Sequence, residues 1–212
     1  MLGVIPAHSP NMSQLRLYYD YDDFLSGKFL RDVLLIRMDK ECSQSRYSIK
    51  NNNVDVNRSK LLVCHDMKNN YLEDQWSRGS YYNNAFQLLH FQNIDVFCYF
   101  SHHFITIPSS TWTNVCHRHG VPVLGTLITE WESGYDICKR IFKSKSTVND
   151  FIGHLLLLIE NCGFDGFLVN IENRLDVDIQ PEGLSAVSLM LYFLEAFTSR
   201  LHHIKSHGLV LW

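Results

Sequence analysis

The sequence predicts an α/β fold in which buried parallel strands alternate with helices. Five short runs after residue 60 are apolar throughout, as strands buried on both faces are, and each contains β-branched or aromatic residues. Segments with helical periodicity separate these runs, so that strands recur about every 30 to 40 residues, the spacing of parallel βα units. The predicted strands are Leu61–Met67, Ile94–Phe100, Val121–Ile128, Phe164–Ile171 and Leu209–Trp212.

The predicted helices are the segments whose apolar residues repeat every three or four positions. The clearest is Thr147–Glu160, which has a wide apolar stripe, and the next is Leu184–Ile204. We interpret Cys116–His119 as the end of a helix that leads into the third strand. A short helix is also predicted at Asp23–Met38.

The chain divides by composition into two parts. Residues 1–59 are polar and irregular, and the tract Ser43–Ser59 with its asparagine run is typical of an exposed loop. We therefore predict an N-terminal extension or linker with a short helix over 1–59. Residues 60–212 carry all five predicted strands.

Charge and cysteine usage restrict the class of protein. The net charge of −3 gives no electrostatic reason to expect nucleic acid or an anionic membrane as a partner. The first ten residues lack the pattern of a secretory signal, and no run approaches the roughly 20 apolar residues of a membrane span. The six cysteines are scattered without a CxxC pair, so we expect no disulfide framework and place the chain in the cytosol.

The arrangement of parallel strands favours a barrel over a dinucleotide-binding sheet. A dinucleotide-binding fold would need a glycine-rich turn after the first strand, and Cys64–Lys68 contains no glycine. A (β/α)₈ barrel needs no such turn, and its chemistry lies at the carboxyl ends of the strands. We therefore look for functional residues at the ends of the five runs.

The fourth predicted strand ends in polar residues that share one face. Side chains alternate along a strand, so Asn170 and Glu172 point to the same side, and Ile171 to the other. Most glycosidases need two carboxylates, and this strand offers only one. A substrate-assisted glycosidase instead uses the 2-acetamido oxygen of the sugar as nucleophile, with an acid and an amide from the protein, which Glu172 and Asn170 could supply. From spacing alone, a loop cap or an arginine pair explains these two residues equally well.

Other side chains are expected at the same rim of the barrel. Asp66, Tyr99, Phe100, His102, Glu130 and Trp131 lie at or just after strand ends and are candidate substrate contacts. Trp131 is the candidate for stacking on a sugar ring, although packing against a barrel helix would also explain it. His102 could equally hydrogen-bond the loop backbone. The pair of histidines in Cys116–His119 lacks the second ligand pair of a zinc site, so no metal is expected.

Four stretches resemble one known family. They are LLVCHDMKNNYL at 61–72, IDVFCYFSHHFITI at 94–107, WTNVCHRHGVPVLGTLITEW at 112–131 and FDGFLVNIEN at 164–173. Together they resemble the cytosolic endo-β-N-acetylglucosaminidases of glycoside hydrolase family 85, over roughly residues 60–212 and in the same order.

This resemblance implies a (β/α)₈ barrel followed by β-sandwich domains. It also implies hydrolysis of the GlcNAc-β1,4-GlcNAc bond in the chitobiose core of N-glycans or free oligosaccharides, without a cofactor. The family's Asn-x-Glu motif falls on Asn170 and Glu172, and Asn173, which follows it, is expected to contact substrate.

The sequence departs from the family in three places. Asn69-Asn70 stands where the family usually has two glycines, Phe167 stands where it has tryptophan, and the chain ends at Trp212, before the family's catalytic tyrosine. Five strands cannot close an eight-stranded barrel, so we expect a partial (β/α)₈ barrel of about the first five βα units. The alternative to an active enzyme is a catalytically inactive truncated form. Glycan preference, the balance of hydrolysis and transglycosylation, and oligomeric state stay open.

Overall fold

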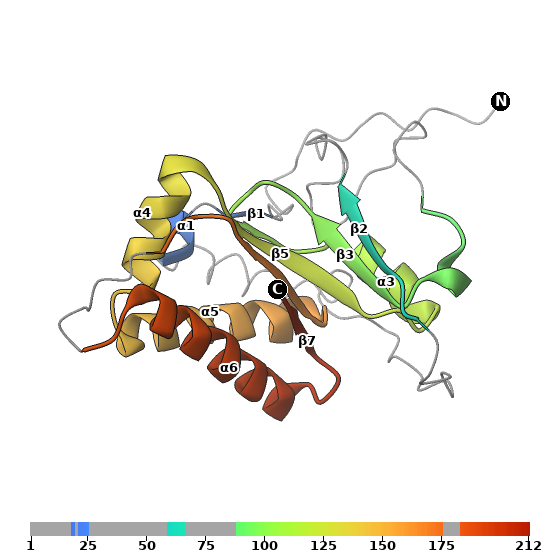
Figure 1. Cartoon of the computed structure of the whole chain (residues 1–212). Helices are drawn as coiled ribbons and strands as arrows, with labels where there is room; N and C mark the ends of the chain where they lie inside the picture. Colours follow the sequence, from blue (N-terminus) through green and yellow to red (C-terminus); the bar gives the residue numbers. More distant parts are fainter. Residues whose placement is uncertain (1–17, 20, 26–58, 67–87, 176–182) are drawn as a thin grey trace.

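The computed structural model describes residues 18–19, 21–25, 59–66, 88–175 and 183–212. Five parallel strands lie side by side in chain order, β2, β3, β5, β6 and β7 (Figure 1). Their bounds are Leu62–Asp66, Val96–Phe100, Val123–Thr129, Gly166–Ile171 and Leu209–Leu211. Parallel strands in sequential order are the arrangement of a (β/α)₈ barrel. The predicted α/β fold class is confirmed.

Helices connect these strands. Their bounds are Phe91–Asn93 for the 3₁₀ helix η1, Ser110–Arg118 for α3, Trp131–Ile141 for α4, Lys145–Cys162 for α5 and Ala186–Ile204 for α6. Helix α5 begins at a capping box of Ser144 and Thr147 and ends at Gly163, whose φ of 79° is in the left-handed region that favours glycine. The helices predicted around Thr147–Glu160 and Leu184–Ile204 are confirmed, and α4 was not predicted.

The helices cover one face of the sheet. Figure 1 shows α5 and α6 together on the same side of the strands. Phe167 of β6 packs against Phe197 of α6 with ring centroids 6.3 Å apart, and both residues are fully buried. A second, smaller cluster lies on β3 and the start of β5 and contains Phe97, Tyr99 and Val123. The side chains on these strands alternate between the face that the helices cover and the opposite face. The candidate site lies on the opposite face.

Part of the N-terminal segment packs onto this body. Strand β1 (Tyr18–Tyr19) pairs antiparallel with β4 (Ile105–Thr106), and helix α1 (Tyr21–Leu25) follows. Phe24 is fully buried, with its ring 5.6 Å from that of Phe151. Tyr21, which is 5% exposed, also belongs to the core, although the sequence predicts a polar extension over 1–59. Residues 26–58, with most of the predicted extension and of the helix Asp23–Met38, lie outside the described residues.

A buried charge lies where β6 begins. Asp165 is fully buried and accepts hydrogen bonds from His117 Nε2 at 2.6 Å, the Val123 backbone N–H at 2.8 Å and Lys205 Nζ at 2.8 Å. His207 Nε2 is 3.4 Å away. Burial alone raises the pKa of this carboxyl, but the hydrogen bonds from His117 and His207 and the charge of Lys205 together hold the pKa well below its usual range. One carboxylate thus joins α3, β5 and the segment between α6 and β7.

Candidate active site

Asn170 and Glu172 lie at the carboxyl end of β6, on the face turned away from the helices. Phe167 and Val169 belong to the main core, so the alternation places Asn170 on the opposite face. The Glu172 backbone N–H donates to Thr129 O at 3.0 Å, which continues the pairing with β5 one residue past the strand. Glu172 therefore keeps the same alternation as Asn170.

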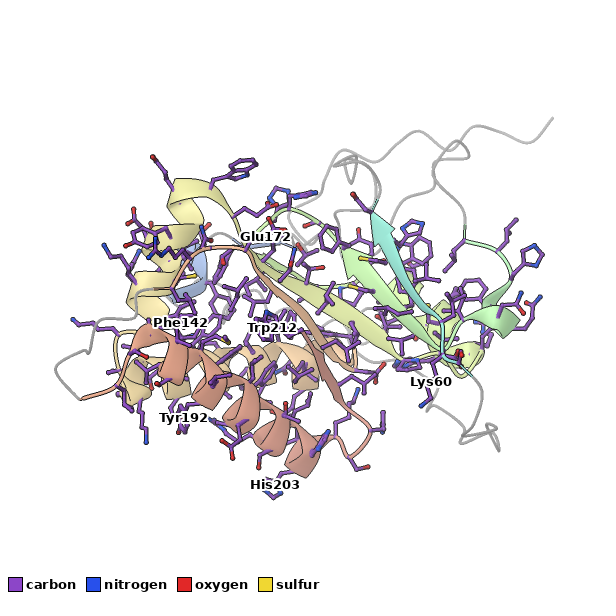
Figure 2. The ribbon with its side chains drawn as sticks, in the orientation of Figure 1. Lys60, Phe142, Glu172, Tyr192, His203 and Trp212 are labelled. Atoms are coloured by element: carbon purple, nitrogen blue, oxygen red, sulfur yellow. The ribbon has the colours of Figure 1, made fainter. Side chains whose placement is uncertain are left out.

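The two side chains also contact each other. Asn170 Nδ2 donates to Glu172 Oε1 at 2.9 Å, and Glu172 is exposed while Asn170 is half-buried. Figure 2 shows Glu172 at the end of the sheet opposite Lys60, which precedes β2. The predicted shared face is confirmed. The catalytic roles of these two residues stay a prediction.

A histidine and two carboxylates follow the neighbouring strands. His102, just after β3, places Nδ1 3.1 Å from both carboxylate oxygens of Glu130, which follows β5. Its Nε2 is 4.0 Å from Asp66 Oδ2, at the end of β2. Phe100 packs its ring edge-on to His102, with centroids 5.4 Å apart and an interplanar angle of 87°. Four of the predicted contacts thus meet at the carboxyl ends of β2, β3 and β5.

The rim therefore carries more carboxylates than β6 alone supplies. Asp66 and Glu130 come from other strands but lie at the same end of the sheet as Glu172. Both face His102, whose side chain is 40% exposed. This grouping joins residues 28 and 36 positions apart along the chain. Sequence spacing could not predict it, although each residue's position after a strand predicted its place at the rim.

Trp131 is presented to solvent by an unusual backbone. Its φ is 56°, in the left-handed region, and 83% of the residue is exposed at the start of α4. A bulky residue rarely adopts this conformation, which costs about 1–3 kcal/mol and is found most often at functional sites. The carbonyl of Trp131 accepts a hydrogen bond from Asn173 Nδ2 at 2.7 Å, which holds the turn. The indole therefore does not pack against another barrel helix, which was the alternative explanation for a tryptophan at this position.

Asn173 does not point to the rim. It follows Glu172 and so has the opposite orientation, toward α4. A side chain at Gly134 would come within 2.3 Å of Asn173 Oδ1, so only glycine leaves room for the amide there. In this structure Asn173 holds the Trp131 turn, and its predicted contact with substrate stays a prediction.

Tyr99 is a second correction. It is 1% exposed and packs with Phe97 and Val123 in the cluster next to α3. Tyr99 and Phe100 are adjacent on β3, so the alternation allows only one of them to face the rim. The prediction that Tyr99 faces substrate was wrong because it treated two consecutive strand residues as sharing a face.

The two histidines at the carboxyl end of α3, His117 and His119, have protein partners. His117 is buried against Asp165, and the ring of His119 stacks on Phe91 with centroids 4.8 Å apart and an interplanar angle of 6°. Within the described ranges, no group of three or more histidine, cysteine, aspartate or glutamate side chains could hold a metal ion. In the same ranges, no helix combines the length and the apolarity that crossing a bilayer requires.

Comparison with known proteins decides the family. Residues 68–212 match the family described as Glycosyl hydrolase family 85, and this range includes Asn170 and Glu172. The chain belongs to glycosyl hydrolase family 85. The family predicted from the sequence is confirmed.

Curated members of family 85 resemble the chain over most of its length. It is 40% identical to cytosolic endo-beta-N-acetylglucosaminidase 2 of Arabidopsis thaliana over 197 residues, which are 93% of this chain and 25% of that protein. It is 44% identical to the Homo sapiens cytosolic endo-beta-N-acetylglucosaminidase over 159 residues, 73% of this chain and 20% of that protein. The chain thus spans a quarter or less of these relatives.

A solved structure supports the fold. The glycoside hydrolase domain of Endo-D from Streptococcus pneumoniae R6 superposes with a TM-score of 0.60 at 18% identity. The superposition covers 79% of this chain and 27% of that one. The five parallel strands and their helices therefore correspond to part of a larger glycoside hydrolase domain, in agreement with the predicted partial barrel.

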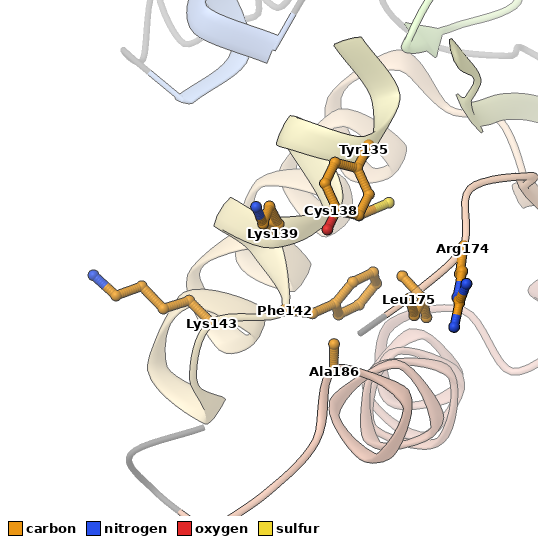
Figure 3. A pocket seen from close by; sticks show the side chains of 8 residues that line it. All are labelled: Tyr135, Cys138, Lys139, Phe142, Lys143, Arg174, Leu175 and Ala186. Atoms are coloured by element: carbon orange, nitrogen blue, oxygen red, sulfur yellow. The ribbon is translucent and has the colours of Figure 1, made fainter. Parts of the chain in front are cut away.

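One pocket of this family 85 chain lies away from the rim. It has a volume of about 250 Å³ between α4, the start of α6 and the segment after β6. Figure 3 shows Arg174 and Leu175 on one side and Tyr135, Cys138 and Phe142 on the other. The complete lining is Tyr135, Cys138, Lys139, Phe142, Lys143, Arg174, Leu175 and Ala186. None of the rim residues lines it, so it takes no part in the site described above.

Proposed function

We propose that the chain carries the catalytic amide and carboxyl of an endo-β-N-acetylglucosaminidase. The substrate is an N-glycan or free oligosaccharide with a chitobiose core, and the bond cut is GlcNAc-β1,4-GlcNAc. The observation that carries this proposal is the direct contact of Asn170 Nδ2 with Glu172 Oε1 at 2.9 Å, on the non-helical face at a strand's carboxyl end.

Each of the two groups has a distinct role in a substrate-assisted mechanism. The acetamido oxygen of the sugar attacks its own anomeric carbon, while protonated Glu172 gives its proton to the leaving oxygen. Asn170 uses its N–H toward Glu172, and its carbonyl oxygen can accept the acetamido N–H. Holding the acetamide in line shortens the approach to the anomeric carbon and stabilises the oxazoline intermediate. Glu172 then activates water for the second step.

The carboxylates near His102 support a second mechanism on the same substrate. Glu130 or Asp66 could act as an enzymatic nucleophile, as in glycosidases with two carboxylates. However, Glu130 holds His102 with both of its oxygens 3.1 Å from Nδ1, and its side chain is only 14% exposed. This arrangement favours a role in positioning groups that bind sugar hydroxyls over a role as nucleophile.

The requirement for the acetamide distinguishes the two mechanisms. A fluorescently labelled high-mannose glycan should be cut to leave one GlcNAc on the label when incubated with the complete gene product that carries this sequence. The same glycan with a hydroxyl in place of the 2-acetamido group at the scissile bond should not be cut. Cleavage of both substrates at similar rates would refute substrate assistance, and cleavage of neither would refute the proposed activity.

Trp131 is proposed as a stacking surface for a sugar ring. Trp131 is 83% exposed, directly follows Glu130, and has its backbone carbonyl held by the Asn173 hydrogen bond. Trp131→Ala is expected to raise KM about tenfold with little change in kcat, because the stacking contact is present in both ground state and transition state. Initial rates over a range of glycan concentrations measure this. Leu89→Ala, which removes another exposed apolar side chain before β3, is the control. An unchanged KM would remove Trp131 from the binding site.

The compartment follows from the relatives. The Arabidopsis and human proteins are both named cytosolic, and we propose the same location for this chain. All five cysteines in the described part of the chain are free thiols, as a reducing compartment would keep them.

A further inference from the structure

Two cysteines occupy paired positions on adjacent strands. Cys64 of β2 and Cys98 of β3 are direct partners in the parallel register. Val63 and Phe97 pack in the cluster next to α3, so Cys64 and Cys98 both point to the opposite face. Adjacent strands are about 4.8 Å apart, which places the two Cα atoms within the range that a disulfide can span.

The two thiols have different surroundings. Cys64 is exposed, whereas Cys98 is fully buried with Sγ 3.9 Å from both Gly125 O and Thr126 Oγ1. The neighbouring Cys98 thiol lowers the pKa of the Cys64 thiol. The neighbouring Cys64 thiol, together with burial, raises the pKa of Cys98 well above its ordinary value. Cys64 is thus an accessible thiol with increased thiolate character, next to a thiol that keeps its proton.

We propose that Cys64 and Cys98 form a reversible oxidation site, at which a hydroperoxide oxidises Cys64 and Cys98 then closes a disulfide between β2 and β3. This site is separate from the proposed hydrolase activity and does not depend on it. An exposed reactive cysteine beside a resolving cysteine is the arrangement that oxidation-sensing thiols require.

The reaction balances with hydrogen peroxide as oxidant. The Cys64 thiolate attacks one peroxide oxygen, the O–O bond breaks, and the departing hydroxide takes a proton to become water. The Cys64 sulfenic acid is then attacked by the Cys98 sulfur. The S–S bond forms, the S–O bond breaks, and the departing hydroxide takes the Cys98 proton to become the second water. Two thiols lose two hydrogen atoms in total, and the peroxide is reduced to two water molecules.

The bond should be easily reversed. Side chains in parallel register start about one strand spacing apart, slightly farther than the Cβ separation of a relaxed disulfide. The disulfide would therefore hold β2 and β3 under strain, and strained disulfides are reduced more readily than structural ones. A monothiol or dithiol reductant should restore both cysteines.

Three other cysteines serve as internal controls. Cys116, Cys138 and Cys162 are buried, and burial raises the pKa of each thiol, to about 12 for Cys116 and Cys162. Iodoacetamide should alkylate Cys64 at least about tenfold faster than any of these three. Equal rates for Cys64 and the buried thiols would contradict the proposed reactivity.

Peptide mapping tests the bond itself. The reduced chain is treated with one equivalent of hydrogen peroxide, blocked with iodoacetamide and digested without reductant. Mass spectrometry should find the peptides of Cys64 and Cys98 joined, lighter by two hydrogen atoms, and separated again by dithiothreitol. Cys64 left as a thiol, oxidised to a sulfonic acid, or joined to any other cysteine would overturn the proposal.

Two variants test whether Cys98 specifically is the partner of Cys64. Cys98→Ala should slow alkylation of Cys64, because the neighbouring thiol that lowers its pKa is gone. It should also leave the Cys64 sulfenic acid trappable by dimedone, because the resolving thiol is gone. Cys116→Ala should still form the Cys64–Cys98 bond. If Cys64 of the Cys98→Ala chain is alkylated at the original rate, the proposed role of Cys98 is contradicted. If that variant does not fold, the peptide mapping of the unsubstituted chain tests the proposal instead.

Discussion

Replacing Glu172 with glutamine is expected to lower kcat for cleavage of a chitobiose-core glycan at least about 100-fold. Glutamine has nearly the same shape, and its carbonyl oxygen can still accept the Asn170 N–H that now reaches Glu172 Oε1. It has no proton to give to the leaving oxygen. The loss should therefore be in the chemical step, with KM changed much less than kcat.

The assay compares initial rates of the Glu172→Gln protein and the unsubstituted protein on the same labelled glycan. Glu195→Gln, an exposed carboxylate on α6, is the matched control and should keep full activity. Circular dichroism shows whether both variants fold. A Glu172→Gln protein that retains more than about a third of the original kcat would exclude Glu172 as the general acid, since that role is worth at least about 100-fold.

Replacing Asp165 with alanine is expected to lower the free energy of unfolding by about 3–5 kcal/mol. The substitution removes the carboxylate that accepts from His117, the Val123 backbone and Lys205, and it leaves these donors buried or half-buried without their acceptor. Urea unfolding followed by circular dichroism measures the change as a shift of the midpoint.

Asp22→Ala is the matched control for Asp165→Ala. Asp22 also pairs with a cation, Arg140, at 2.8 Å, but the two side chains are 83% and 54% exposed. An exposed ion pair is worth about 0–1 kcal/mol, so this variant should unfold near the original midpoint. Equal loss of stability in both variants would contradict the importance of burial at Asp165.

The stabilisation from Asp165 should depend on pH with a definite sign. Its folded-state pKa lies below the unfolded value of about 3.9, so the folded state favours the ionised carboxylate. The contribution is fully present above the unfolded pKa and is lost as pH falls toward the folded pKa. The difference in stability between the original chain and Asp165→Ala should thus be constant near neutrality and shrink below about pH 4.

The sequence predicted the strands well because their signal is local. Five continuous apolar runs gave five parallel strands, each within a few residues of its predicted bounds. Strands β1 and β4 have two residues each, too short for any periodicity to show. Helix α4 was missed because its first three residues are exposed and its buried residues, Gly134, Cys138 and Ile141, include only one large apolar side chain.

The site was predictable where it depends on strand alternation. Asn170 and Glu172 are two positions apart on one strand, so their shared face followed from the sequence. Contacts between residues on different strands did not follow from the sequence. The contact of His102 with Glu130 and the hydrogen bond from Asn173 to Trp131 join residues far apart in the chain, and no local sequence pattern predicts them. Applying the same alternation to Tyr99 and Phe100 would have assigned Tyr99 to the core.

The central claim is that Asn170 and Glu172 act together on one acetamido sugar, and Asn170→Ala tests it most directly. The measurement is the rate of hydrolysis of the natural glycan beside the rate of consumption of a preformed sugar oxazoline, with Asn161→Ala on α5 as control. Hydrolysis should fall at least about 100-fold because the acetamide is no longer held for attack, while the oxazoline, in which that attack is already complete, is still consumed. Normal hydrolysis by the variant, or an equal loss of both reactions, would contradict the claim.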